Sequence, residues 1–302
     1  NIGGGFKNDT IMRYKMKSEM KKYYQKAGVP VAKHQLLVDL ASAENFIKEV
    51  GYPIFIKPNI GVGAADTYRI QNEQELKDFF AKKDPITIYI MEQFVDGTVV
   101  SYDGISNSQA EPLFEVQNIF PVPNDDLVNN LTDDYYYTLP TLEKDVATLG
   151  RKVLKAFDVK KRFFHLEFFR LNQDHPGLGK KGALIGLEVN MRPAGGYTPD
   201  MYNFALSTDV YRIYAEMMAE DQTSLKESHN KYYCVEVARH DAYAGSYQYN
   251  DEDINLKFGN AIKMSGRYPK VLASGLGDIF YIARFKTLEE INTFKDFVLK
   301  RV

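Results

Sequence analysis

An alternating segment at residues 186–196 restricts the fold more than any other stretch of the chain. Polar and apolar residues alternate there until a run rich in proline and glycine ends the pattern. Because side chains of a β-strand point alternately to its two faces, we expect Glu188, Asn190 and Arg192 on one face and Leu187 on the other. A carboxylate, an amide oxygen and a guanidinium suit a hard divalent cation and the phosphates that it carries. The alternative at this point is an ordinary half-exposed strand.

A second acid, Glu167, lies in a strand-like segment at residues 164–170 and is flanked by aromatic residues. Unpaired acids are seldom buried, so a carboxylate in such a setting indicates a function. Together Glu167, Glu188 and Asn190 predict a site for two Mg²⁺ ions and a nucleotide. His165 shares the alternation of Glu167, and we expect it to be a packed histidine without a role in the site.

Composition describes an ordinary globular chain. The 302 residues are 44% hydrophobic and 26% charged, which favours two or three lobes. The formal net charge of −2 offers no diffuse attraction to nucleic acid or anionic lipid, so neither is expected as a partner. Cys234 is the only cysteine, which excludes an intramolecular disulfide and favours a reducing, cytoplasmic location. No apolar run reaches the roughly 18 residues of a membrane span.

The order of helical and strand-like segments predicts an α+β fold with largely antiparallel sheets. We expect a first lobe over residues 1–95, a second over 96–228 and an accessory α+β region over 229–302. A helix is predicted for 10–27 and another for 208–218.

Lys57 ends an apolar strand and precedes a loop that contains Gly61 and Gly63. A lysine there can place its ammonium against a phosphate, and glycines let backbone N–H groups approach closely. The alternative is an exposed lysine at a strand end. No Gly-Lys-Ser/Thr sequence follows the loop, so a P-loop kinase is disfavoured.

A short connector follows the apolar strand at residues 86–91 and begins with Glu92, Gln93, Phe94 and Val95. A connector between lobes can recognise adenine through its backbone N–H and C=O groups, with apolar side chains against the ring. Taken alone, the same residues would be a turn after a strand.

Lys57 with its glycine loop, the connector, Glu167 and the Glu188–Asn190–Arg192 set occur in this order and at suitable spacing. Together they resemble the ATP-grasp superfamily, particularly its carboxylate–amine ligases and the modules of carbamoyl-phosphate synthase type. The resemblance covers about residues 13–225. It implies the ATP-grasp fold, with two α/β lobes and ATP between them. It also implies a leading Rossmann-like domain, which we expect to be absent from the given chain.

The resemblance also implies roles for individual residues. Glu167, Glu188 and Asn190 would hold two Mg²⁺ ions, with Mn²⁺ as a possible substitute, and Arg192 would act with Lys57 in catalysis. Asp103 or Asp96 would replace a ribose-binding glutamate whose position is occupied by Val99. The implied nucleotide-binding set is Lys17, Lys57, Gly61, Gly63, Glu92, Gln93, Phe94, Val95, Asp103 and Leu187.

The activity implied is an ATP-dependent ligase that converts a small carboxylate into an acyl phosphate for attack by an amine, releasing ADP and phosphate. Its partners would be small-molecule carboxylates and amines, and the protein could form a homodimer. One alternative keeps the fold but phosphorylates bicarbonate or carbamate, as carbamoyl-phosphate synthase modules do. The other is a nucleotide-binding module without turnover.

Overall fold

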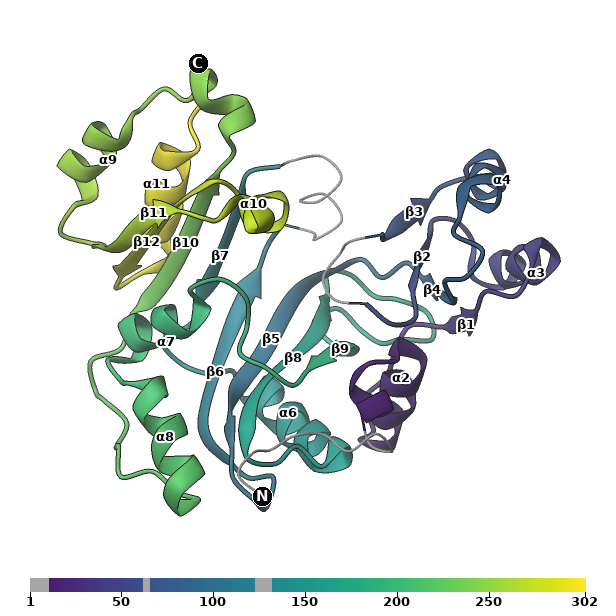
Figure 1. The fold of residues 1–302 in the computed structure, drawn as a ribbon, viewed down its shortest axis with the longest axis horizontal. Coiled ribbons are helices and arrows are strands. Elements are labelled where there is room, and N and C mark those ends of the chain that lie inside the picture. The colour runs from purple at the N-terminus through teal and green to yellow at the C-terminus, as the bar shows by residue number, and fades with distance from the viewer. Residues whose placement is uncertain (1–10, 62–65, 123–131) are drawn as a thin grey trace.

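The computed structural model describes residues 11–61, 66–122 and 132–302, which form two β-sheets of unequal size with helices packed on them (Figure 1). The smaller sheet has the strand order β1-β4-β2-β3, and all its pairs are antiparallel. Its strands are β1 (His34–Leu36), β2 (Ile54–Pro58), β3 (Tyr68–Ile70) and β4 (Tyr89–Gln93). We call this sheet with its two helices the first lobe.

Helices α3 (Leu40–Val50) and α4 (Glu73–Lys82) share one apolar core with the smaller sheet. Asp39 and Asn72 begin these helices by accepting hydrogen bonds from backbone N–H groups of the first turn, as residues at helix N-caps commonly do. Phe46 of α3 and Phe79 of α4 are buried in the core.

The larger sheet has eight strands in the order β11-β12-β10-β7-β6-β5-β8-β9, and every recorded pair is antiparallel. The prediction of a mixed fold with antiparallel sheets is therefore confirmed. The strands are β5 (Gly97–Ser106), β6 (Pro112–Phe120), β7 (Asp134–Thr138), β8 (Arg162–Leu171), β9 (Leu184–Asn190), β10 (Tyr233–Arg239), β11 (Ile262–Arg267) and β12 (Ile279–Phe285). This sheet with its helices is the second lobe.

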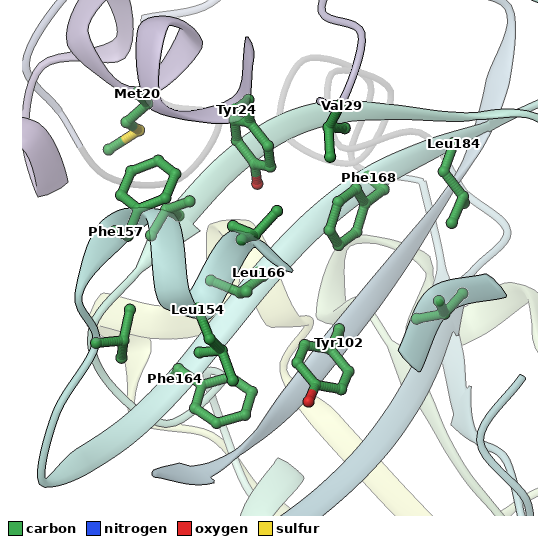
Figure 2. Close-up of a cluster of buried hydrophobic side chains, with 14 of the residues drawn as sticks. Met20, Tyr24, Val29, Tyr102, Leu154, Phe157, Phe164, Leu166, Phe168 and Leu184 are labelled. Carbon is green, nitrogen blue, oxygen red and sulfur yellow. The ribbon is translucent and has the colours of Figure 1, made fainter. Parts of the chain in front are cut away.

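The helices of the second lobe gather in several apolar clusters around the sheet. One cluster joins Phe157 of α6 to Phe164 and Phe168 of β8 (Figure 2). The helices are α6 (Lys144–Phe157), α7 (Thr198–Leu206), α8 (Val210–Glu220), α9 (Asp251–Phe258), α10 (Lys270–Leu276) and α11 (Leu288–Val298), with 3₁₀ turns η1 (Met12–Tyr14) and η2 (Asp241–Ser246).

Helix α2 (Lys17–Lys26) links the two lobes. It comes before the first lobe in the chain, yet Met20 and Tyr24 pack into the cluster of α6 and β8 (Figure 2). Asn59, at the end of β2, caps the helix: its carbonyl accepts from Lys17 N at 2.8 Å and its side chain from Ser18 N at 2.9 Å. The end of β2 is thereby fixed to the start of α2.

Residues 229–302 continue the larger sheet, because β10, β11 and β12 extend it beyond β7. The expected accessory region thus shares a sheet with the second lobe. Cys234 lies in β10 and is fully buried.

The prediction of one helix over 208–218 was incomplete, since the structure has two, α7 and α8. The run of Pro and Gly before residue 200 suggested a loop, but Pro199 lies in the first turn of α7, where its missing N–H costs nothing. The helix expected over 10–27 is also shorter in the structure. It consists of α2, which the separate turn η1 precedes.

Candidate functional site

A cavity of about 270 Å³ lies between the lobes, and residues of α2, β2, the β4–β5 connector, β8 and β9 line it. Its walls differ in character. One part is apolar and is formed by Phe55, Phe94, Val95, Val99, Phe169 and Leu187. The other part carries charged and polar groups, namely Lys17, Lys57, His165, Glu167, Glu188, Asn190 and Arg192.

The three predicted metal ligands lie together on neighbouring strands. Glu167 of β8 and Glu188 of β9 are directly paired in the antiparallel register, and Asn190 is paired with His165. Burial raises the pKa of Glu188, and the charge of Glu167 raises it further against the opposite effect of Lys17. Two carboxylates that oppose each other in this way are stabilised by a divalent cation.

A β-bulge explains why the side chain of Leu187 lines the cavity. Between Glu167 and Phe168 the register shifts, so that Phe168 pairs with Gly186 and Leu187 is the extra residue. Strict alternation predicted Leu187 on the face opposite Glu188, but the bulge lets both neighbours line the cavity. Leu187, which the resemblance includes in the nucleotide-binding set, lines the cavity, whereas the alternation argument was wrong for this residue.

His165 is part of the site, contrary to the expectation of a packed histidine without a role. Its Nδ1 lies 2.5 Å from Asp103 Oδ1 and its Nε2 lies 3.2 Å from Glu167 Oε1. Although burial opposes the charge, these two carboxylates raise the pKa of His165 to about 10. Burial likewise opposes ionisation of Glu167, but the hydrogen bond from His165 lowers its pKa. The sequence indicated this position for His165, because His165 and Glu167 share the same alternation and therefore the same face of the strand.

The structure corrects the expectation that Asp103 binds the ribose. Asp103 is 1% exposed and lies outside the cavity lining. Its carboxylate is occupied by hydrogen bonds from Ser101, Asn118 and His165. The alternative, Asp96, does line the cavity.

The two predicted lysines both reach the cavity. Lys57 Nζ lies 2.9 Å from Glu92 Oε2, and Lys17 Nζ lies 3.5 Å from Glu188 Oε1. A third lysine, Lys21, is 1% exposed and lies 3.3 Å from Glu92 Oε1. Burial opposes ionisation of Glu92, but Lys21 and Lys57 lower its pKa to about 2.

Glu92 therefore does not have the predicted position in an adenine-binding connector. It belongs to β4, paired with His34 of β1 and with Phe55 of β2, so its backbone lies inside the sheet. Gln93 also belongs to β4, and its side chain faces His175 with 3.5 Å between the Nε2 atoms. Phe94 and Val95 form the connector itself and line the cavity.

Arg192 lines the cavity but lies beyond the end of β9, not on the strand as the alternation suggested. Its Nη1 donates to the carbonyl of Pro193 at 2.9 Å. Gly61 offers its carbonyl to Lys17 Nζ at 3.1 Å, and Gly63 falls outside the described residues.

A larger, more open depression of about 700 Å³ lies by Arg239, His240 and Tyr247. The Arg239 guanidinium there is bonded to the Val298 carbonyl. Among the described residues there is no cluster of three or more His, Cys, Asp or Glu side chains suited to a metal. The Glu167–Glu188–Asn190 set is not such a cluster, because its third donor is an amide.

Known proteins resemble this chain in both sequence and fold. Residues 16–97 match the family described as the carbamoyl-phosphate synthase L chain, ATP binding domain. A carbamoyl phosphate synthase large chain from Thermotoga sp. is 31% identical over 96 residues, which are 31% of this chain and 9% of that protein. A phosphoribosylamine–glycine ligase from Fusobacterium nucleatum is 23% identical over 251 residues, which are 77% of this chain and 57% of that protein. The chain thus spans little more than half the length of the second relative and much less of the first.

The fold resembles that of an L-amino acid ligase from Bacillus licheniformis, with a TM-score of 0.72 at 16% identity. That similarity covers 99% of this chain and 75% of the ligase. No helix among the described residues has the length and apolar character needed to cross a membrane. Nearly the whole chain therefore has the ATP-grasp fold, and residues 16–97 also match the sequence of an ATP-binding domain.

Proposed function

We propose that this protein is an ATP-dependent ligase that activates a small carboxylate as an acyl phosphate for attack by an amine. The observation that carries the proposal is the division of one cavity into an apolar recess and a charged end. The recess by Phe94, Val95 and Leu187 is suited to a purine ring. Lys17 and Lys57 at the charged end are suited to its phosphates.

In this proposal Glu167, Glu188 and Asn190 hold Mg²⁺, as one or two ions, with Mn²⁺ as a possible substitute. The fit rests on the donor set, since two opposed carboxylates and an amide oxygen are ligands that Mg²⁺ prefers. The metal would neutralise phosphate charge as the phosphoryl group is transferred.

The residues of the chain itself have three tasks. Lys57 and Lys17 bind phosphate oxygens, His165 orients the Glu167 carboxylate, and Arg192 binds the oxyanion that develops when the amine attacks. A guanidinium can contact two oxygens at once, and its place at the rim of the cavity leaves it free to do so. No nucleophilic side chain is required, because the carboxylate substrate itself attacks the phosphoryl group.

The L-amino acid ligase and the phosphoribosylamine–glycine ligase support a reaction that joins a carboxylate to an amine. The match to the carbamoyl-phosphate synthase domain favours bicarbonate as an alternative substrate for phosphorylation. A cytoplasmic location and a homodimer remain predictions.

The test is a screen of the full-length protein with pairs of amino acids and other small carboxylates and amines, in which ADP and phosphate release are measured. We expect sustained ADP formation that requires the carboxylate and an amine acceptor. Hydroxylamine in place of the amine should trap the acyl phosphate as a hydroxamate, with release of ADP and phosphate. Glu188→Gln should retain the fold and lose several orders of magnitude of turnover. ADP formation that depends on bicarbonate alone would favour the alternative substrate, and nucleotide binding without any turnover would exclude the ligase.

A further inference from the structure

Tyr24 of α2 lies directly behind the two acid-bearing strands and has no role in the proposed chemistry. Its side chain is completely buried, and its ring packs edge-on against Phe157 and Phe168 with centroids 5.6 and 5.7 Å away (Figure 2). A Cβ at Gly186 would lie 2.5 Å from the ring. The absence of a side chain at residue 186 therefore lets the ring reach the strand backbone.

The Tyr24 hydroxyl contacts the backbone carbonyls of both acids that we propose as metal ligands. It lies 3.0 Å from the carbonyl oxygen of Glu167 and 2.8 Å from that of Glu188. Because a hydroxyl has one proton, the two carbonyls share it. A single donor thus spans β8 and β9 at the point where both carboxylate side chains leave the backbone.

This contact coincides with the β-bulge, where the regular ladder of hydrogen bonds is disrupted. Lys21, on the same face of α2, donates from Nζ to the carbonyl of Leu187 at 3.3 Å. After the helix, the carbonyl of Pro30 accepts from Gly186 N at 2.8 Å. Helix α2 and the residues that follow it therefore supply bonds to the bulge that the two strands do not make with each other.

We propose that Tyr24 is a positioning residue of the metal site, whose hydroxyl fixes the bulge and thereby the separation of the Glu167 and Glu188 carboxylates. The inference rests on the proposed function, since it takes these acids as metal ligands. Groups that orient metal ligands without touching the metal commonly change metal affinity about 10- to 100-fold when they are removed. Tyr24→Phe keeps the ring in its packing and removes only the hydroxyl.

The same apolar cluster offers a matched control, Tyr14, which is 6% exposed. Its hydroxyl donates to the carbonyl of Phe157 at 2.6 Å, so Tyr14→Phe also removes a buried bond from a tyrosine to the backbone. Tyr14 contacts neither of the acid-bearing residues through this bond. The two variants therefore separate loss of a buried hydrogen bond from loss of support for the bulge.

The experiment measures Mn²⁺ binding by electron paramagnetic resonance on the full chain, with and without ADP, together with the melting temperature of each variant. We expect the Mn²⁺ dissociation constant of Tyr24→Phe to rise about 10- to 100-fold, whereas Tyr14→Phe keeps the wild-type value. Both variants should lose a similar few degrees in melting temperature.

Two results would overturn the role of Tyr24. Wild-type Mn²⁺ affinity in Tyr24→Phe would show that the hydroxyl does not position the ligands. Equal weakening in both variants would show a general effect of core stability. If the wild-type protein itself bound no Mn²⁺, with or without ADP, the metal site of the proposed function would be wrong and the role of Tyr24 would be lost with it.

Discussion

The ammonium group of Lys57 is largely buried, and the carboxylate of Glu92 stabilises its charge. Glu92 lies between Lys57 and Lys21, with Nζ–Oε separations of 2.9 and 3.3 Å. Buried charges are stable only when they are paired, yet here one carboxylate serves two ammonium groups. An incoming phosphate would give these two ammonium groups a further negative partner.

Lys57→Ala should therefore weaken ADP binding by about 1–3 kcal/mol, which is roughly a fivefold to 150-fold rise in the dissociation constant. Isothermal titration calorimetry measures this directly. Lys33→Ala is the control, because Lys33 belongs to an exposed ion pair with Glu49 outside the cavity lining. An unchanged affinity in a folded Lys57→Ala variant would remove this lysine from the nucleotide site.

At this scale the sequence was informative where a charged side chain had to be explained, as for Glu167, Glu188 and Lys57. It failed where the answer depended on a neighbour distant in sequence. Asp103 was interpreted as a ribose ligand because nothing local shows that His165 occupies it. Leu187 was assigned to the wrong face because a bulge depends on the partner strand.

The contact between α6 and β5 shows how one glycine can control the packing of two elements. Gly150 of α6 faces the ring of Tyr102, and a Cβ there would lie 2.3 Å from a ring carbon. The ring cannot retreat easily, because it is fully buried and its hydroxyl is bonded to Glu115. Replacement of glycine by alanine inside a helix normally gains up to about 1 kcal/mol, but overpacking costs about 1–3 kcal/mol.

Gly150→Ala should accordingly lower the free energy of unfolding, by about 1–3 kcal/mol. Gly275→Ala in α10 is the matched substitution, because a Cβ at Gly275 would meet nothing within 4 Å. It should be neutral or stabilising by up to about 1 kcal/mol. Urea denaturation of both variants measures the difference, and equal effects of the two substitutions would contradict this account of α6 packing.

Among the elements, those with a clear period were predictable, including the antiparallel strands. Helix α7 was missed because its first turn is rich in residues that usually mark loops. The linking position of α2 was also not predictable, since its contacts with β8 and β9 join residues more than 140 positions apart.

On the scale of the whole molecule, the last strands bring a buried acid close to the cavity rim. Glu236 of β10 is 2% exposed and accepts hydrogen bonds from Tyr136 at 3.1 Å and Tyr268 at 2.8 Å. Tyr136 also contacts Thr198, which donates to the carbonyl of Gly195 in the bend after Arg192. The C-terminal strands therefore support the bend that carries the proposed catalytic arginine.

Burial raises the pKa of Glu236 from 4.5 to about 7, and the nearby Asp134 adds to this effect. The folded protein then holds a proton that the unfolded chain releases above pH 4.5, so the free energy of unfolding falls as the pH rises from about 4.5 to 7. The contribution of this group is roughly 3 kcal/mol over that range and is constant on either side of it.

Glu236→Gln should flatten the pH dependence, because glutamine has nearly the same shape and does not ionise. Urea denaturation at several pH values between 5 and 8 measures the slope for both proteins. A variant that loses stability between pH 5 and 7 as steeply as the wild type would show that Glu236 does not titrate in this range.

The burial of Cys234 has a practical consequence for observing the two lobes. Burial raises the pKa of this thiol, the only one in the chain, so the reactive thiolate is disfavoured and shielded. Cysteines introduced at Gln74 on α4 and Ala215 on α8, both exposed, can therefore carry a pair of fluorescent dyes while the native thiol stays in place. Energy transfer between the dyes would then report the distance between the lobes, molecule by molecule, as nucleotide is added.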